Sequence, residues 1–233
     1  MSPAKVVSVS LFGNKEKYLR GADKLTDSIQ KTLPEWKIVF FVGNSVPQRI
    51  KESLESRNAT LVMVDEPENL SATAWRFRVG ELGNPDWVIF RDSDSIVSSR
   101  EARAITQWVE SGRVAHIIRD HPFHSSKILA GLWGLRPKEA EWFAREVRDF
   151  DFLDTYGSDQ DFLADRIYPK ISKTSLVHAS FHRHEHPSQL ADFTIGSSRI
   201  GPFCGESITE NLIVRSYARL RRLFAKKACK CKT

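Results

Sequence analysis

The stretch Trp87-Val88-Ile89-Phe90-Arg91-Asp92-Ser93-Asp94-Ser95 decides the fold prediction, because an uninterrupted apolar run ends abruptly in two carboxylates. Four apolar residues without polar alternation are typical of a strand that is buried on both faces, as in a parallel sheet covered by helices. Ligands of open α/β sheets collect at the carboxyl ends of the strands. Asp92 and Asp94 therefore occupy the place where such a fold would hold a reactive pair.

The chain before this stretch alternates short apolar runs with amphipathic segments of helical length. Strands are predicted at 6–12, 38–42 and 60–64, with helices over about 16–32 and 48–56. After it, a helix opens at Ser98 with Glu101 in the capping-box position. Apolar segments follow at 115–118 and 128–135. Helices are predicted at about 137–147 and from residue 158, and a short strand at 174–177. This order predicts an α/β fold with one mixed, mostly parallel central sheet flanked by helices.

Length and composition place the chain among single-domain globular proteins. It has 233 residues, of which 41% are hydrophobic, enough to bury a sizeable core. No apolar window approaches the roughly 18 residues of a membrane span, and the N-terminus shows no signal-peptide pattern, so we predict a cytoplasmic protein. The three cysteines are read as reduced thiols.

The formal net charge of +6 is concentrated near the end of the chain. The last stretch carries eight basic residues: Arg215, Arg219, Arg221, Arg222, Lys226, Lys227, Lys230 and Lys232. The rest is near neutral, which argues against a basic groove and against nucleic acid as a partner. Apolar residues at Ile213, Tyr217, Leu220 and Phe224 alternate with these charges, as in a helix lying on an anionic membrane surface, although a solvated C-terminal helix has the same pattern.

Asp92 and Asp94 have the chemistry of a metal-diphosphate site. Carboxylates separated by one residue can bind one divalent cation, and Mg²⁺ or Mn²⁺ prefers such hard oxygen ligands. Phosphate oxygens would complete the coordination, and the cation would offset the charge that a diphosphate gains when it leaves a sugar. A solvated Asp turn is the alternative, since Asp and Ser are common in turns. The position after a buried fourth strand favours the metal site.

The sequence resembles glycosyltransferases of the GT-A fold, whose DxD motif follows the strand that ends the nucleotide-binding half. The matching runs are 90–95, Arg100-Glu101, Arg119-Asp120-His121-Pro122 with His124, Gly131-Leu132-Trp133-Gly134 and Tyr156-Gly157-Ser158-Asp159-Gln160, as in bacterial glycosyltransferase-like proteins. The resemblance implies a hexosyltransferase-like enzyme that uses Mn²⁺ or Mg²⁺, a nucleotide diphosphate sugar, and a glycan or lipid-linked acceptor of the cell surface. It implies a domain at 1–205, with a nucleotide-binding half at about 1–95 and an acceptor half at about 96–205. The basic helix and tail at 206–233 lie beyond it.

The resemblance also assigns residues to the reacting sugar and the metal. Asp159-Gln160-Asp161 is similar to the Asp-Gln-Asp segment of glycogenin-type transferases beside the transferred sugar, although acidic residues after Ser158 also suit a helix N-terminus. GT-A enzymes often take a further metal ligand from a late strand, and His178 matches that position. Asp120 is a candidate general base or sugar-hydroxyl acceptor, with an ion pair to Arg119 as the alternative.

A third set of candidates would contact the nucleotide diphosphate. Phe12, Asn14 and Tyr18 would frame the base, and Arg76 would reach the diphosphate. Phe12 as ordinary core and Arg76 as a snorkelling helix residue are the alternatives. The residues within the acidic motif, Arg91 and Ser93, belong to the same predicted site.

Two other functions fit parts of the pattern. A phosphohydrolase of the haloacid-dehalogenase type also uses Asp-x-Asp after an apolar strand, but there the motif usually opens the domain. A non-catalytic nucleotide- or glycan-binding module on a GT-A scaffold is the second, since a fold does not establish chemistry.

Overall fold

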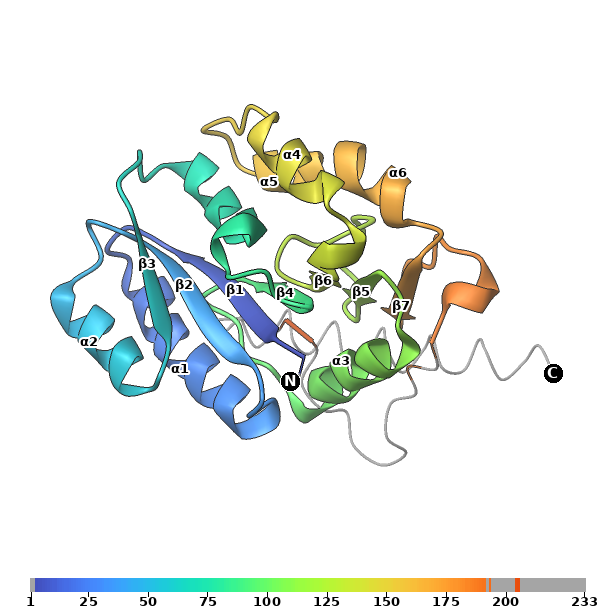
Figure 1. The fold of residues 1–233 in the computed structure, drawn as a ribbon, viewed down its shortest axis with the longest axis horizontal. Helices are drawn as coiled ribbons and strands as arrows, with labels where there is room; N and C mark the ends of the chain where they lie inside the picture. The colour runs from blue at the N-terminus through green and yellow to red at the C-terminus, as the bar shows by residue number, and fades with distance from the viewer. Residues whose placement is uncertain (1–2, 192, 194–203, 206–233) are drawn as a thin grey trace.

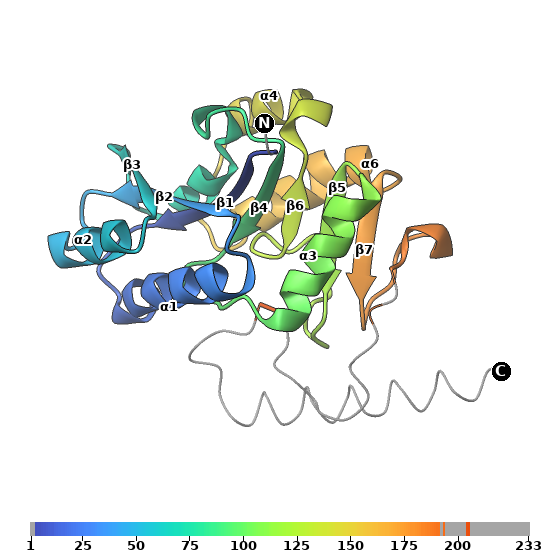
Figure 2. The same ribbon diagram turned by 60° about the horizontal axis from the view of Figure 1, so that its bottom comes forward.

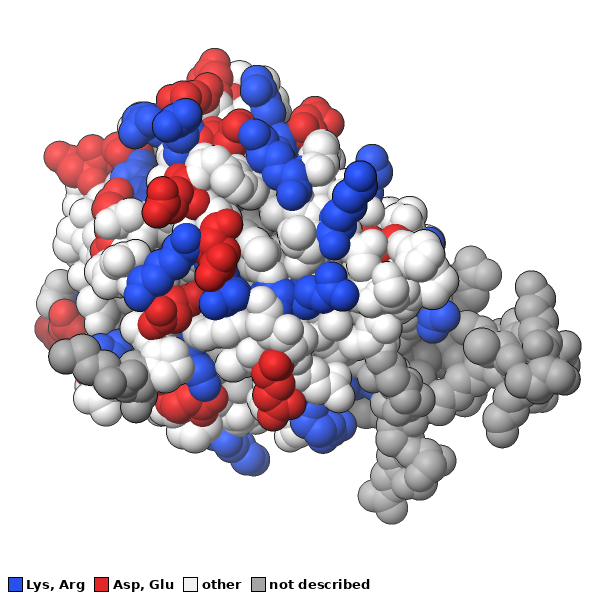
Figure 3. Space-filling model, turned by 45° about the vertical axis from the view of Figure 1, so that its right-hand side comes forward, with Lys and Arg blue, Asp and Glu red and all other residues white. Residues whose placement is uncertain are grey.

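The computed structural model describes residues 3–191, 193 and 204–205. The basic helix and tail predicted for 206–233 lie outside these residues. Within the described part of the chain, no helix is long and apolar enough to cross a bilayer. On the face shown in Figure 3, Lys and Arg side chains are interspersed with Asp and Glu.

A mixed seven-stranded sheet, counted over the described residues, runs through the middle of the molecule in the order β3-β2-β1-β4-β6-β5-β7. β1 is parallel to β2 and β4, β2 is parallel to β3, and β5 is parallel to β7. Among the strands of the described residues, only β6 runs antiparallel to its neighbours, β4 and β5. The predicted α/β fold with a mixed, mostly parallel sheet is confirmed. The strands are β1 (Lys5–Leu11), β2 (Lys37–Gly43), β3 (Thr60–Val64), β4 (Trp87–Arg91), β5 (Ala115–Arg119), β6 (Trp133–Leu135) and β7 (Ser175–Ala179).

Helices cover both faces of the sheet, as Figures 1 and 2 show. One face carries α1 (Glu16–Thr32), α2 (Gln48–Ser56) and α3 (Ser99–Ser111). The other carries η1 (Leu70–Phe77), α4 (Trp142–Arg148), α5 (Ser158–Phe162) and α6 (Tyr168–Ile171). Three-residue 3₁₀ turns are η2 (Val79–Glu81), η3 (Pro137–Glu139) and η5 (Pro187–Gln189), and η4 (Leu163–Ile167) is a short π-helix.

Alternation along the strands separates two apolar cores, one for each helical layer. Val7 and Val9 of β1 pack in the core with α1, whereas Val88 and Phe90 of β4 pack in the core with α4 and α5. On β1 the intervening residues are serines. Because Ser8 Oγ donates to the Arg76 carbonyl at 2.6 Å and the Arg76 N–H donates to Ser10 Oγ at 2.8 Å, η1 is fixed against the sheet.

The second half departs from the predicted elements in two places. The single helix predicted at 137–147 is broken into η3 and α4, since Ala140 leaves the helical region at φ −143°. The helix that begins at Ser158 widens into the π-helix η4 before α6. Pro169 explains the change, because it has no N–H to donate to the carbonyl one turn earlier.

Candidate functional site

The turn Asp92-Ser93-Asp94 directly follows β4 and is closed by its own residues. Ser95 donates to the Asp92 carbonyl twice, from N at 3.3 Å and from Oγ at 2.9 Å. The Asp92 side chain is 53% exposed and that of Asp94 is 12% exposed. The two carboxylates therefore stand at the carboxyl edge of the sheet, with Asp92 open to solvent on one side.

Arg91 supports this turn from within the protein. Its side chain is 1% exposed; it donates to Glu101 Oε1 at 2.5 Å, Gly131 O at 3.0 Å and Ser95 Oγ at 2.9 Å. Glu101 stands in the first turn of α3, whose N-cap is Ser98 as predicted. Burial raises the pKa of the Glu101 carboxyl despite the Arg91 charge. Arg91, predicted to contact the sugar donor, is thus a buried brace beneath the turn in this structure.

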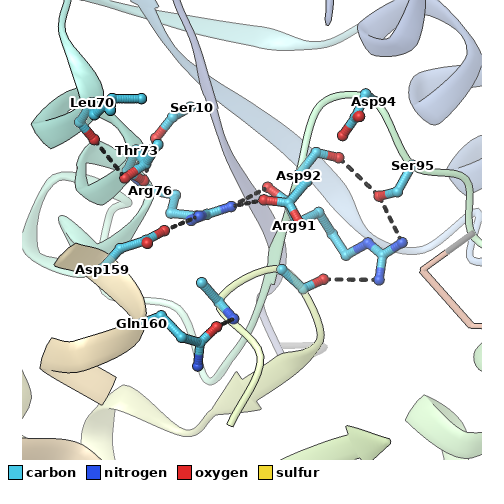
Figure 4. Close-up of polar contacts among 12 residues, drawn as sticks. Ser10, Leu70, Thr73, Arg76, Arg91, Asp92, Asp94, Ser95, Asp159 and Gln160 are labelled. Carbon is cyan, nitrogen blue, oxygen red and sulfur yellow. Dashed lines mark hydrogen bonds and ion pairs between the residues drawn. The ribbon is translucent and has the colours of Figure 1, made fainter. Parts of the chain in front are cut away.

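Arg76 joins the acidic turn to the second half of the chain (Figure 4). One guanidinium nitrogen contacts the Asp92 carboxylate and the Arg91 carbonyl, the latter at 3.3 Å. The other donates to Asp159 Oδ2 at 2.5 Å, and the Arg76 side chain is 4% exposed. Lost solvation raises the pKa of Asp92, but the charge and hydrogen bond of Arg76 outweigh it and leave that pKa below its ordinary value. Arg76 therefore holds Asp92 and Asp159 together.

Lys17 is the second cation of the cluster, and sequence reasoning did not include it. Its Nζ lies 2.5 Å from Asp94 Oδ2 and 5.2 Å from the centre of the Tyr18 ring. Burial lowers the pKa of Lys17, but the hydrogen bond and charge of Asp94, together with Tyr18 and Asp92, leave that pKa above its ordinary value. The available signal was its position, since Lys17 lies in the first turn of the helix that follows β1. With Arg76 and three carboxylates, the cluster carries one uncompensated negative charge.

Two glycines allow the surrounding backbone to approach the acidic turn. A Cβ on Gly21 of α1 would lie 2.6 Å from Asp94 Cα and would also meet the Ser93 carbonyl oxygen. A Cβ on Gly131 would overlap the Asp92 carboxylate and lie 3.0 Å from the Asp92 nitrogen. Ser93, predicted to contact the sugar donor, is buried beside Gly21. Both glycines are required by close packing around the turn.

Asp159 and Gln160 enter the site from the N-terminus of α5. Asp159 is almost buried and makes the ion pair with Arg76. The Gln160 side chain is engaged with the segment before β6: its Oε1 accepts from Ala130 N at 3.2 Å, and its Nε2 donates to Ile128 O. The structure thus brings Asp159 to the acidic turn and uses the Gln160 amide to hold the neighbouring loop.

The residues predicted for the nucleotide base lie where β1 ends and α1 begins. Phe12 packs edge-on against Trp75 with ring centres 5.6 Å apart, Asn14 is exposed, and Tyr18 is 37% exposed. Glu68 fixes this edge by accepting from the backbone N–H of Gly13 at 3.0 Å.

Asp120, the predicted base, is not accessible in this structure. Its side chain is fully buried, and its oxygens accept from Arg100 at 3.0 Å twice, from Ser180 Oγ at 2.6 Å and from the Cys204 N–H at 3.2 Å. The predicted pair with Arg119 is replaced, because Arg119 pairs with Glu185. Asp120 ties β5 to α3, to the residue after β7 and to the described C-terminal residues.

His178, the predicted third metal ligand, faces α3 from within β7. Its Nδ1 lies 2.9 Å from His116 Nε2, and its Nε2 lies 2.8 Å from Gln107 Oε1. Burial lowers the pKa of His178 to about 4. The predicted strand ended before this residue, whereas β7 includes it and turns its ring into the layer beneath the sheet. Both ring nitrogens are therefore already hydrogen-bonded.

The donor set of the acidic turn fits a divalent cation that shares its coordination with phosphate. Among the described residues, no group of three or more His, Cys, Asp or Glu side chains is arranged to hold a metal ion. Asp92 and Asp94 supply hard carboxylate oxygens, and Asp92 is both solvent-accessible and held in its charged form. Such a pair leaves most coordination positions to ligand oxygens or water.

Comparison with protein-family models finds no match to this chain, and comparison with curated proteins finds none either. Solved structures do match. Glucosyl-3-phosphoglycerate synthase from Mycobacterium tuberculosis, in complex with Mn²⁺, UDP and glucosyl-3-phosphoglycerate, gives a TM-score of 0.50 at 14% identity over 74% of this chain and 69% of that chain. S. aureus TarS 1–349 in complex with UDP gives a TM-score of 0.53 at 13% identity over 76% of this chain and 58% of that chain. This chain therefore has the GT-A fold of nucleotide-sugar glycosyltransferases.

Proposed function

We propose that this protein is a metal-dependent glycosyltransferase that moves a hexose-type sugar from a nucleotide diphosphate sugar to an acceptor hydroxyl. The observation that carries the proposal is the ion-pair cluster at the carboxyl end of β4, where Asp92 and Asp94 meet Lys17 and Arg76 and where Arg76 reaches Asp159. The matched solved structures support it, because both were solved in complex with UDP and the mycobacterial one also with Mn²⁺.

The charges of the cluster suit a metal-bound diphosphate. With one uncompensated negative charge, the protein groups attract a divalent cation, and the loaded site then attracts a diphosphate. A bound Mn²⁺ or Mg²⁺, held by Asp92 and Asp94, would supply positive charge to the leaving diphosphate. Lys17 and Arg76 are placed to add hydrogen bonds to the same oxygens.

Asp159 is the carboxylate best placed beside the transferred sugar. It stands at the N-terminus of α5 and is oriented by Arg76 toward the acidic turn. Gln160 keeps the loop before Gly131 in position by its two hydrogen bonds. We assign Asp159 to the sugar and Gln160 to positioning, and we place the nucleotide base between Phe12, Asn14 and Tyr18.

A glycan or lipid-linked acceptor and a cytoplasmic location remain part of the proposal, as does peripheral membrane contact through the C-terminal helix. The sequence resemblance supports the acceptor, and the basic amphipathic pattern after residue 206 supports the membrane contact.

A nucleotide panel tests the function. The melting temperature is measured with UDP-, GDP-, CDP- and dTDP-sugars, each with and without Mn²⁺, for the wild type, Asp94→Asn and the surface control Asp27→Asn, whose side chain is 61% exposed. One nucleotide at a hundred times its Kd should raise the melting temperature by roughly 5 °C only with metal, in the wild type and the control but not in Asp94→Asn. Failure of every nucleotide to stabilise the wild type refutes the proposal.

The same samples separate the two alternative functions. Hydrolysis of the bound sugar nucleotide over hours distinguishes an enzyme from a binding module. Release of phosphate from p-nitrophenyl phosphate that depends on Asp92 would indicate a phosphohydrolase instead.

A further inference from the structure

The Arg76 guanidinium pairs with the Asp92 carboxylate, which is one of the two groups that would bind the metal. One of its nitrogens contacts Asp92 Oδ1, while Asp92 Oδ2 lies against Gly131. A cation arriving at Asp92 therefore meets an oxygen that already has a positive partner. At the other carboxylate, Lys17 is 41% exposed and can return to water, whereas the buried Arg76 cannot do so without moving within the protein.

The surroundings of Arg76 allow it to change partners without leaving the site. Its second nitrogen is anchored by Asp159, and its backbone is fixed to β1 by Ser8 and Ser10. Arg76 Nε is buried and has no hydrogen-bond partner among the described residues, so the guanidinium has a donor to spare. Only the contact to Asp92 faces the half-exposed side of the cluster.

We propose that Arg76 is an exchangeable internal counterion of Asp92: it weakens metal binding to the empty site, and an incoming diphosphate accepts the guanidinium and leaves Asp92 to the metal. The inference rests on the proposed function for the identity of the diphosphate. The consequence is that metal and nucleotide bind cooperatively. The diphosphate draws away the Arg76 charge that opposes the metal, and the metal neutralises the Asp92 charge that opposes the diphosphate.

Opposite changes in two affinities test this role. Free Mn²⁺ is measured by electron paramagnetic resonance without nucleotide, and UDP, GDP, CDP and dTDP binding by calorimetry at saturating Mn²⁺. Arg76→Gln should bind Mn²⁺ alone about ten-fold tighter, because the competing charge is gone. It should bind the recognised nucleotide at least about ten-fold more weakly, because a charge-assisted hydrogen bond is lost. A residue that only maintains the fold would weaken both.

Arg78→Gln is the matched control, since Arg78 follows η1 directly and pairs with Glu66 at the surface. It should leave the Mn²⁺ affinity unchanged. If Arg76→Gln does not fold, Arg76→Lys takes its place: one nitrogen on a shorter side chain replaces the two guanidinium nitrogens that contact Asp92 and Asp159 separately, so the contact to Asp92 weakens and Mn²⁺ should again bind more tightly than to the wild type. Unchanged or weaker Mn²⁺ binding in a folded variant overturns the inference. If the Arg76 variant binds Mn²⁺ more tightly but the wild type binds none of the nucleotides, the proposed function is refuted, whereas the role of Arg76 as a counterion of Asp92 is retained.

Discussion

Replacing Gly21 by alanine has two opposing effects on stability, a gain in helix propensity and a loss from overpacking. Gly21 lies inside α1, where Ala is favoured over Gly by about 1 kcal/mol. The new Cβ, however, would lie 2.6 Å from Asp94 Cα and 3.0 Å from Ser93 C, whereas carbon atoms in contact normally stand about 3.5–4.0 Å apart. The neighbours are backbone atoms that cannot rotate away. The helix and the acidic turn must therefore separate by about 1 Å, at an overpacking cost of about 1–3 kcal/mol.

Packing should outweigh propensity, so we expect Gly21→Ala to lower the free energy of unfolding in urea by up to about 2 kcal/mol. It should also weaken Mn²⁺-dependent nucleotide binding, because the turn that carries Asp94 moves. Gly80→Ala is the control, since nothing lies within 4 Å of its Cβ position. A Gly21→Ala protein that is as stable as the wild type and binds nucleotide normally would refute this account of the turn.

Three further predictions concern buried or partly buried polar side chains. Glu101→Ala leaves the Arg91 guanidinium unpaired and should lower the free energy of unfolding by about 3–5 kcal/mol in urea denaturation; a loss below about 1 kcal/mol would show that the pair is not buried in solution. His178 titrates near 6.5 when unfolded and at about 4 when folded, so only the unfolded chain takes up its proton between these values. Stability should therefore fall as the pH drops from 6.5 to 4, by on the order of 3 kcal/mol from this group, with a shallower fall in His178→Gln; equal slopes would contradict it. Gln160→Glu removes the donor to the Ile128 carbonyl and should speed hydrogen exchange at Ala130 relative to the wild type; unchanged protection would exclude the proposed clamp.

Local patterns explain how much of the fold the sequence could predict. The bounds of α1, α2 and β3 follow from periodicity and agree with the structure, because each element depends on residues close together in the chain. The same patterns could not show that β6 is antiparallel, since three residues carry no signal of direction. Nor could they show the π-helix before Pro169, because it depends on which backbone hydrogen bond of the helix is lost at the proline.

The sequence was sufficient to predict the carboxylates Asp92 and Asp94 of the candidate site, but not the ion pairs that they form. Asp92 follows an apolar strand, which sequence alone reveals. The partner of Arg76 at Asp159 lies 83 residues away, and only the docking of α5 beside η1 makes that pair. His178 was predicted to follow a strand that ends at residue 177 and to point toward the metal. Because β7 continues to Ala179, the His178 ring instead faces α3.

The antiparallel strand β6 also determines when the site can form during folding. The block β3-β2-β1-β4 uses residues up to Arg91 only, so its parallel pairs can form while the remainder of the chain is still being synthesised. Gly131 and Asp159 come much later and reach the acidic turn only when β6 inserts between β4 and β5. We therefore expect a nascent chain to acquire its sheet early and its complete site last, which makes ligand binding a strict test of whether the second half has docked.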